Sequence, residues 1–392
     1  MIPYGRQEVT EADIAAVVAV LRSDFLTQGP AVPRFEQAVA AKVGARHAVA
    51  VNSATSALHI ACLALGLGPG DLLWTVPTTF VASANCGRYC GADVDFVDID
   101  PLSWNLSVPK LADKLARARR AGRLPKLLVP VHLTGQPTEQ EAIFELAREY
   151  GVRVLEDASH AVGASRNGEP VGSCRWSDIC VFSFHPVKII TSGEGGIALS
   201  NDDEVAERLR MLRSHGITRD ANRFEGSGRE PGDDSDEAAG WHYEQQMLGF
   251  NYRLIDVQAG LGLSQFDRLE QYVERRNVLA ERYDHLLAGT PLQLPTLTPG
   301  NRSAFHIYVV RLLDAGGGRH RRIYDALRER NIGVNVHYMP VHLQPYYRAL
   351  GFHEGQFPEA EAYGHSAITL PLYPALDESE QDHVVSALRH SL

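Results

Sequence analysis

Short β-branched runs alternate with helix-like stretches between about residue 43 and residue 200, and no other feature of the sequence constrains the fold as strongly. Strands separated by helices indicate βαβ units, in which the strands run parallel and helices cover both faces of the sheet. The alternation therefore predicts an α/β fold with a mostly parallel seven-stranded sheet, on which ligands bind beyond the carboxyl ends of the strands. The predicted strands are residues 47–51, 72–76, 94–97, 127–131, 152–156, 179–184 and 196–200, with helices at 56–65, 111–119 and 139–150.

The periodic pattern breaks in the segment 219–246, which is acidic and rich in glycine. Its composition favours a mobile surface loop. A substrate lid is the alternative interpretation, because long loops inside compact domains are often functional. We expect a large domain over residues 1–254, which includes an N-terminal helical segment and this loop, and a smaller C-terminal α/β domain over residues 255–392. In the smaller domain, helices are predicted at 255–287, 319–330 and 378–389, and strands at 305–312 and 334–337.

Composition excludes several classes of protein. The formal net charge of -10 argues against nucleic acid or an anionic membrane as the main partner. The five cysteines form no CxxC pair and lack zinc-ligand spacing, which indicates reduced thiols and no metal site. The start of the sequence lacks the basic residues and apolar run of a signal peptide, and no stretch approaches the ~20 apolar residues of a membrane span. We expect a soluble cytoplasmic protein.

Two motifs suggest other functions at first sight. The segment 66–70 is rich in glycine, but it follows a predicted helix and lacks the GxGxxG spacing, so a dinucleotide site is not expected. His337, His342 and His353 lack the helical spacing of a metalloprotease site. We interpret these histidines as loop residues that face a cleft or lie satisfied in the core.

Lys188 follows the apolar run 179–184 after three residues and precedes the glycine-rich segment 193–196. A lysine delivered to a strand end can be desolvated, which lowers its pKa and frees the amine for attack on a carbonyl. Such lysines form Schiff bases with carbonyl substrates or with pyridoxal phosphate (PLP). Most lysines are solvated surface charges, so this interpretation requires further residues.

Three other strand-end features supply them. The segment 52–57 follows a strand and opens a helix, where small residues and free amides suit an anion, although an ordinary helix cap uses the same residues. Asp157 comes directly after the predicted strand 152–156. It either caps the next segment or accepts a hydrogen bond from a cationic ring nitrogen, the contact that PLP chemistry requires. Phe80 either packs in the core or stacks on a flat cofactor ring. Together with Lys188, these features supply every contact that PLP needs.

With these residues, the chain resembles the sugar aminotransferases of the DegT/DnrJ/StrS family, which have the fold-type I PLP architecture. The resemblance runs along nearly the full length. Within the family, residues 241–253 and 337–347 are most similar to the 4-aminotransferases of pseudaminic acid biosynthesis. The matching segments are 29–30, 52–58, 68–71, 156–158, 183–188, 193–196, 249–253 and 340–345.

The resemblance implies a role for each site residue. Lys188 would form the internal aldimine with PLP and shuttle the proton, Asp157 would keep the pyridine nitrogen protonated, and His160 would lie near the phenolic oxygen of the ring. Phe80 would stack on the ring. The phosphate would be bound by Ala54, Thr55, Ser56 and Ser183, and by Asn251 from the neighbouring subunit. The implied active unit is therefore a homodimer with shared active sites, which favours the lid interpretation of 219–246.

The implied reaction is a ping-pong transamination, from L-glutamate to C4 of a UDP-linked 4-keto-6-deoxy-N-acetylhexosamine. Family position indicates Tyr4, Arg6, His185 and Tyr338 as substrate-pocket residues. Ile189 and Ser192 depart from residues frequent in relatives, which leaves the sugar open: a 3-keto sugar, a 4-amino-arabinose type substrate or an inositol are the alternatives. The dehydratases of the family replace the lysine, which this chain keeps, and a non-catalytic protein on the same fold is the remaining alternative.

Overall fold

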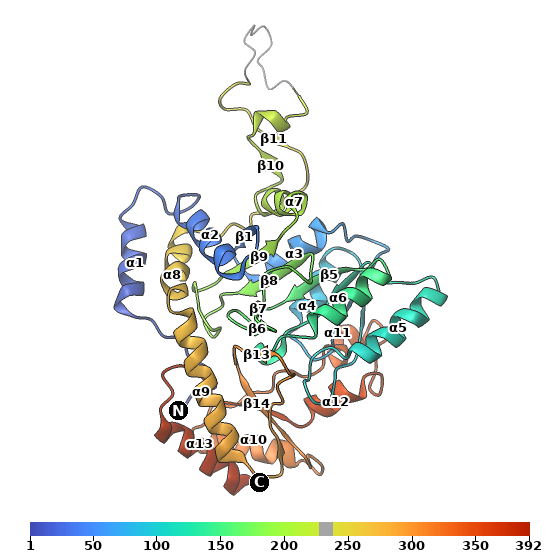
Figure 1. Cartoon of the computed structure of the whole chain (residues 1–392), viewed down its shortest axis with the longest axis vertical. Helices are drawn as coiled ribbons and strands as arrows, with labels where there is room; N and C mark the ends of the chain where they lie inside the picture. The colour runs from blue at the N-terminus through green and yellow to red at the C-terminus, as the bar shows by residue number, and fades with distance from the viewer. Residues whose placement is uncertain (227–237) are drawn as a thin grey trace.

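The central sheet has seven strands in the order β1-β9-β8-β5-β4-β2-β3 (Figure 1). The structure is a computed structural model that describes residues 1–226 and 238–392. β9 runs antiparallel to both of its neighbours, and the remaining pairs are parallel, so the mostly parallel sheet predicted from the sequence is confirmed. The strands are β1 (His47–Val51), β2 (Leu72–Thr75), β3 (Asp93–Phe96), β4 (Leu127–Val129), β5 (Arg153–Asp157), β8 (Ile179–Ser183) and β9 (Gly196–Ser200).

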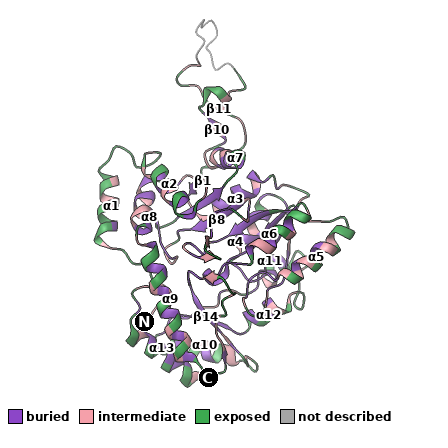
Figure 2. Cartoon of the chain, in the orientation of Figure 1, coloured by how far each residue is buried: buried purple, intermediate pink, exposed green. Residues whose placement is uncertain are grey.

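Helices cover both faces of this sheet because successive strand residues point to opposite sides. Val181 lies in a core shared with α3 and α7, while its neighbour Phe182 lies in a core shared with α2 and α8. The interior residues of these strands are buried except in the edge strand β3, where Asp95 is half-buried (Figure 2). The helices of this part are α1 (Glu11–Leu21), α2 (Ala31–Val43), α3 (Ala54–Ala64), α4 (Ala82–Tyr89), α5 (Val108–Arg120), α6 (Gln140–Glu149), α7 (Asp203–Arg213) and α8 (Asp256–Phe266).

The C-terminal part has its own core, formed around a three-stranded antiparallel sheet in the order β12-β14-β15. α9, α10 and α13 pack on it through residues such as Tyr283, Leu327 and Leu388. We keep the boundary between residues 254 and 255 as a proposal. The elements are α9 (Leu269–Leu287), β12 (Leu292–Gln293), β14 (Tyr308–Leu312), α10 (Arg319–Glu329), η3 (Val341–Leu343), α11 (Pro345–Arg348), α12 (Pro358–Gly364), β15 (Ala367–Leu370) and α13 (Glu378–Ser391).

Three predicted elements of this part need correction. The helix predicted over 255–287 is two helices, with a break at residues 267–268. The strand predicted at 305–312 begins at Tyr308, because Phe305 has φ +41° and the carbonyls of residues 305 and 306 accept hydrogen bonds from Arg276 instead. The strand predicted at 334–337 is wrong: the segment makes one bridge to β15, at Asn335, and then leaves the sheet.

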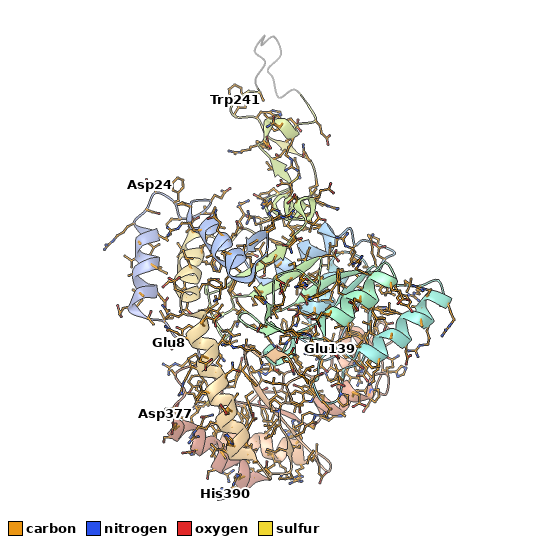
Figure 3. All side chains as sticks on the ribbon, in the orientation of Figure 1. Glu8, Asp24, Glu139, Trp241, Asp377 and His390 are labelled. Carbon is orange, nitrogen blue, oxygen red and sulfur yellow. The ribbon has the colours of Figure 1, made fainter. Side chains whose placement is uncertain are left out.

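A projecting arm starts at the pair β10 (Ile217–Thr218) and β11 (Glu244–Gln245) (Figure 1). The arm also holds η2 (Ala221–Arg223), and Trp241 lies far from the body of the molecule (Figure 3). The loop-or-lid prediction for 219–246 falls partly on residues 227–237, which lie outside the described residues. Elsewhere, β6 (Ser165–Arg166), β7 (Glu169–Pro170) and β13 (Asn301–Arg302) form a small sheet, and η1 (Leu133–Gly135) follows β4. None of the helices in residues 1–226 and 238–392 has the length and apolar character needed to cross a bilayer.

Candidate active site

A cavity of about 390 Å³ lies at the carboxyl end of the parallel strands, where ligands of such sheets bind. Its lining includes Asp157 and Ser183, the last residues of β5 and β8, and the first residues of α3. The structure thus brings together most residues that the sequence singled out. Those that line the cavity are Tyr4, Ala54, Thr55, Phe80, Asp157, His160, Ser183, His185, Tyr338 and Lys188.

Lys188 reaches this cavity from the turn that follows β8, where its backbone N–H donates to the carbonyl of His185. The side chain is partly buried and makes its closest polar approach to His306, with Nζ 3.5 Å from Nε2. Burial lowers the pKa of Lys188 to about 8, against the opposing effect of Asp157. Near pH 8, half of the molecules therefore carry a neutral, nucleophilic amine.

Asp157 is buried, and its carboxylate is held from two directions. Ser83 Oγ, on α4, donates to Oδ2 over 2.6 Å, and the backbone N–H of Ser159 donates to Oδ1 over 3.1 Å. Ser83 Oγ lies in turn 2.7 Å from Thr79 Oγ1. This network fixes the carboxylate at the strand end, where it can accept a hydrogen bond from a cationic ring nitrogen.

The start of α3 forms an anion site. Ser53 caps the helix, with its hydroxyl accepting from the backbone N–H of Ser56 over 3.1 Å, so the first amides, at Ala54 and Thr55, have no carbonyl partner within the helix. A Cβ at Gly196 would lie 2.4 Å from the nitrogen of Ala54, so only glycine lets β9 pass this close to the cavity wall. Free amides and the helix dipole favour a phosphate here.

Three histidines surround the amine of Lys188. Burial is the main cause that lowers the pKa of His160 and of His306 well below the usual value, and it lowers the pKa of His337 to about 4. The imidazoles are therefore neutral at physiological pH. Tyr338 OH lies 3.2 Å from His160 Nε2, and burial raises the pKa of this tyrosine. The amine thus faces neutral acceptors and one carboxylate rather than a cluster of charges.

Three predicted site residues are not among those that line the cavity. Ser56 lies one position further along α3, and its hydroxyl lies 3.0 Å from Ser53 Oγ. Arg6 lies near Tyr373 rather than in the lining. Asn251 is exposed at the base of the arm, where its backbone bridges to Ser214. Their predicted roles stay predictions, and the role of Asn251 is the one that a second subunit would test.

Sequence reasoning missed several residues of the site. His306, Asn335 and Glu194 line the cavity without having been singled out, and His337 was interpreted only as a loop histidine. Ser83 was missed although it holds Asp157. Glu194 and His337 lie in segments that the resemblance covers, 193–196 and 337–347, and could have been named from it. No local motif marks Ser83, His306 or Asn335, which reach the site through packing between distant segments.

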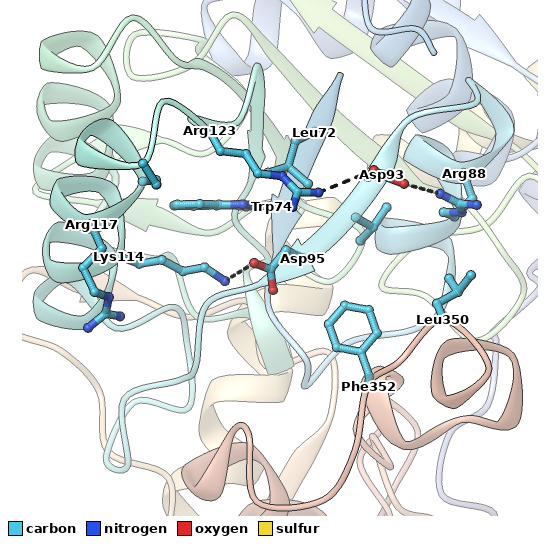
Figure 4. Close-up of a pocket in the computed structure, with 13 residues that line it drawn as sticks. Leu72, Trp74, Arg88, Asp93, Asp95, Lys114, Arg117, Arg123, Leu350 and Phe352 are labelled. Carbon is cyan, nitrogen blue, oxygen red and sulfur yellow. Dashed lines mark hydrogen bonds and ion pairs between the residues drawn. The ribbon is translucent and has the colours of Figure 1, made fainter. Parts of the chain in front are cut away.

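A larger cavity, of about 590 Å³, lies at the free edge of β3 and contains none of the predicted site residues (Figure 4). Three of the four cations that line it are engaged: Arg88 and Arg123 pair with Asp93, and Lys114 Nζ lies 2.6 Å from Asp95 Oδ2. Lys114 also donates to the carbonyl of Phe96. These contacts cover the backbone of an edge strand, which would otherwise invite pairing with another chain, so we assign this cavity a structural role.

The cavity at the strand ends fits PLP. The start of α3 suits its phosphate, Asp157 suits its ring nitrogen, and the Lys188 amine, with a pKa of about 8, suits its aldehyde. Among the described residues, no group of three or more His, Cys, Asp or Glu side chains is placed to hold a metal ion.

Comparison with known proteins gives consistent matches along the whole chain. The model of the DegT/DnrJ/EryC1/StrS aminotransferase family matches residues 7–389. The spore coat polysaccharide biosynthesis protein SpsC of Bacillus subtilis is 37% identical over 393 residues, covering 99% of this chain and 96% of that protein. PseC of Helicobacter pylori, an aminotransferase involved in the biosynthesis of pseudoaminic acid, superposes with a TM-score of 0.89 at 28% identity, covering 100% of this chain and 98% of that one. Spr1654 of Streptococcus pneumoniae has been solved in PMP and PLP forms. Its PMP form superposes with a TM-score of 0.89 at 28% identity, covering 100% of this chain and 99% of that one.

Proposed function

The chain belongs to the DegT/DnrJ/EryC1/StrS family of PLP-dependent sugar aminotransferases, and on that premise we propose that it transfers the amino group of L-glutamate to C4 of a UDP-linked 4-keto-6-deoxy-N-acetylhexosamine. The family, the fold-type I architecture, the enzyme class and the cofactor predicted from the sequence are confirmed. The choice of sugar and of glutamate is our proposal. The similarity to PseC along the whole chain supports it.

One observation carries the chemistry: an amine with a pKa of about 8 and a carboxylate held by Ser83 occupy the same cavity. Bound PLP supplies an electrophilic carbon and an electron-withdrawing ring. Lys188 would take the Cα proton of the amino donor and return it, because a pKa of about 8 leaves its amine neutral in about a tenth of the molecules at pH 7 and in about half at pH 8. Asp157 would accept a hydrogen bond from the ring nitrogen and keep it protonated.

Other residues would bind and orient. The amides of Ala54 and Thr55, with Ser183, would hold the phosphate, and His160 and Phe80 would contact the ring. Tyr4, His185 and Tyr338 line the same cavity and would contact the sugar. Arg6 would have to approach from outside the present lining.

We also propose a cytoplasmic homodimer in which Asn251 completes the site of the neighbouring subunit. The exposed arm supports a second subunit, since Trp241 is 71% exposed and Leu248 is 80% exposed on the described surface. Large apolar side chains at such exposure mark interaction surfaces more often than solvated loops. Asn251, exposed and outside its own cavity, lies next to this arm.

A coupled assay tests the proposed reaction. Purified PLP-loaded protein and its Lys188→Ala and Lys188→Arg variants would be incubated with L-glutamate and with UDP-linked or dTDP-linked 4-keto and 3-keto sugars, and the amino sugar identified by mass spectrometry and NMR. We expect the UDP-linked 4-keto-6-deoxy-N-acetylhexosamine to give the highest kcat/KM with the wild type and no turnover with either variant. Faster turnover of a 3-keto sugar, or of a keto-inositol added to the same panel, would select an alternative acceptor. Wild-type turnover by Lys188→Ala would disprove the role of the lysine.

A further inference from the structure

His306 approaches Lys188 from the other part of the chain, 118 residues further along. Its Nε2 lies 3.5 Å from Lys188 Nζ, and within the described residues it is the one side chain at hydrogen-bond distance from that amine. The ring is buried, with 5% exposed, and it lines the cavity. Its Nδ1 is buried without a hydrogen-bond partner in the described structure, so the ring makes its one polar contact through Nε2, toward Lys188.

The backbone that carries His306 is fixed by a buried arginine. Arg276 Nη1, on α9, donates to the carbonyls of Phe305 (3.2 Å), His306 (3.0 Å) and Leu372 (3.0 Å). On the other side, a Cβ at Gly135 would lie 3.0 Å from the nitrogen of His306, so η1 packs directly against this segment. Arg276 and η1 therefore hold the backbone at His306 in place, and this fixes the position of the imidazole.

The charged and titratable groups that face Lys188 define what His306 can do. They are Asp157, His160, His306 and His337. The oxygens of Asp157 accept from Ser83 and from the N–H of Ser159. His306 is neutral because burial lowers its pKa, so Nε2 can present a lone pair to an N–H of the amine while Nδ1 carries the ring proton.

We propose that His306 is a positioning residue for Lys188: its Nε2 accepts one N–H of the free amine and thereby directs the lone pair of that amine toward the Cα proton of the amino donor. The amine takes this proton, becomes an ammonium that still donates to Nε2, and later returns the proton, so His306 itself gains and loses none. The inference rests on the proposed transamination, in which Lys188 moves the proton.

Two measurements on His306→Phe and His306→Gln test it. In PLP-free protein, competitive acetylation followed by mass spectrometry gives the titration midpoint of Lys188 without any catalysis. We expect His306→Phe to lower this midpoint below about 8, because an acceptor of the ammonium is lost, and His306→Gln to restore it in part. In PLP-loaded protein, single turnovers with L-glutamate, protonated or deuterated at Cα, should slow about 100-fold in His306→Phe, with unchanged donor affinity and a larger isotope effect.

The matched control is His59→Phe, since His59 is buried among the rings of Tyr89, Phe250 and Tyr252, outside the cavity. It should change neither the Lys188 titration nor the isotope effect. An unchanged Lys188 midpoint in His306→Phe, or a rate loss with weaker donor binding and no change in isotope effect, would overturn the proposal in favour of a structural role. If His306→Phe does not fold, His306→Leu takes its place. If the wild type shows no half-reaction with glutamate, the proposed donor fails, and the Lys188 titration still decides the role of His306.

Discussion

Ser83 Oγ donates a 2.6 Å hydrogen bond to Asp157 Oδ2, across 74 residues of sequence. Ser83 lies on α4 and Asp157 is the last residue of β5. The bond therefore joins a helix on one face of the sheet to a carboxylate at the carboxyl end of a central strand. Both groups are buried, which strengthens the bond relative to water. The aspartate that we propose keeps the ring nitrogen protonated is therefore oriented before any cofactor enters.

Removal of this hydroxyl should weaken cofactor binding. In Ser83→Ala the carboxylate loses a charge-assisted hydrogen bond, of the kind that contributes about 1.5 kcal/mol or more, so the Kd of PLP should rise about 10-fold. Equilibrium titration of the apoprotein, followed by absorbance, measures this. The control is Ser386→Ala, on the exposed face of α13, which should leave the Kd unchanged. Equal affinities in all three proteins would show that Ser159 alone holds the carboxylate.

The stability of the PLP-free protein should depend on pH through Lys188. Burial lowers the pKa of this lysine from 10.5 to about 8, so unfolding takes up a proton between these values, and this contribution makes the protein more stable as pH rises through that window. Lys188→Met removes the buried cation. It should be more stable than the wild type below about pH 8, and this advantage should shrink as the pH approaches about 10. Urea denaturation of both apoproteins across the range measures the difference, and a pH-independent difference would mean that Lys188 titrates as in the unfolded chain.

Glu156, the neighbour of Asp157, should be a stability residue rather than a catalytic one. Its buried carboxylate accepts from Gln140 Nε2 (2.7 Å) and Ser177 Oγ (2.8 Å), and His132 Nε2 lies 3.2 Å away. Glu156→Ala leaves these buried polar groups without their acceptor and should cost about 3 kcal/mol or more of unfolding free energy.

Chemical denaturation of the holoenzyme measures that loss. Glu145→Ala, on the exposed side of α6, is the matched control and should stay within about 0.5 kcal/mol of the wild type. A Glu156→Ala variant of wild-type stability with reduced activity would instead place Glu156 in the chemistry.

The residues that local sequence could identify are those that follow a strand directly. Lys188 and Asp157 follow or end the apolar runs of β8 and β5, which pair in parallel, and the helix start at Ser53 follows β1. β1 points the same way as β8 because both run antiparallel to β9 between them, so all three features lie at the carboxyl ends of these strands. Ser83 and His306 have no such mark. They reach the site because α4 packs on the sheet and because Arg276 holds the 305–306 carbonyls, and long-range packing of this kind leaves no spacing in the sequence.

The same physical reason explains the strand errors in the C-terminal part. Residues 305–307 and 334–337 have β-like composition, yet the carbonyls of Phe305 and His306 accept from Arg276. In the second segment Asn335 alone bridges to β15, and the carbonyl of His337 accepts from Tyr363 OH instead. These segments line the active-site cavity, and their backbone departs from the strand that their composition predicts. Such departures are expected at functional sites.

The proposal that two subunits share each active site can be tested by mixing two variants. If Asn251 completes the site of the neighbouring subunit, Lys188→Ala and Asn251→Ala damage different partners of the same site. Each homodimer should be severely impaired, whereas a heterodimer holds one site with both residues intact and one with neither. Random reassociation of equal amounts makes about half of the dimers heterodimers, so about one quarter of wild-type activity should return. Mixing after mild denaturation measures this recovery. The heterodimer, purified through separate tags on the two subunits, should show about half of wild-type activity because one of its two sites is intact. No recovery in a purified heterodimer would mean that Asn251 acts in its own subunit or not at all, and would leave Lys188 and Asp157 working within a single chain.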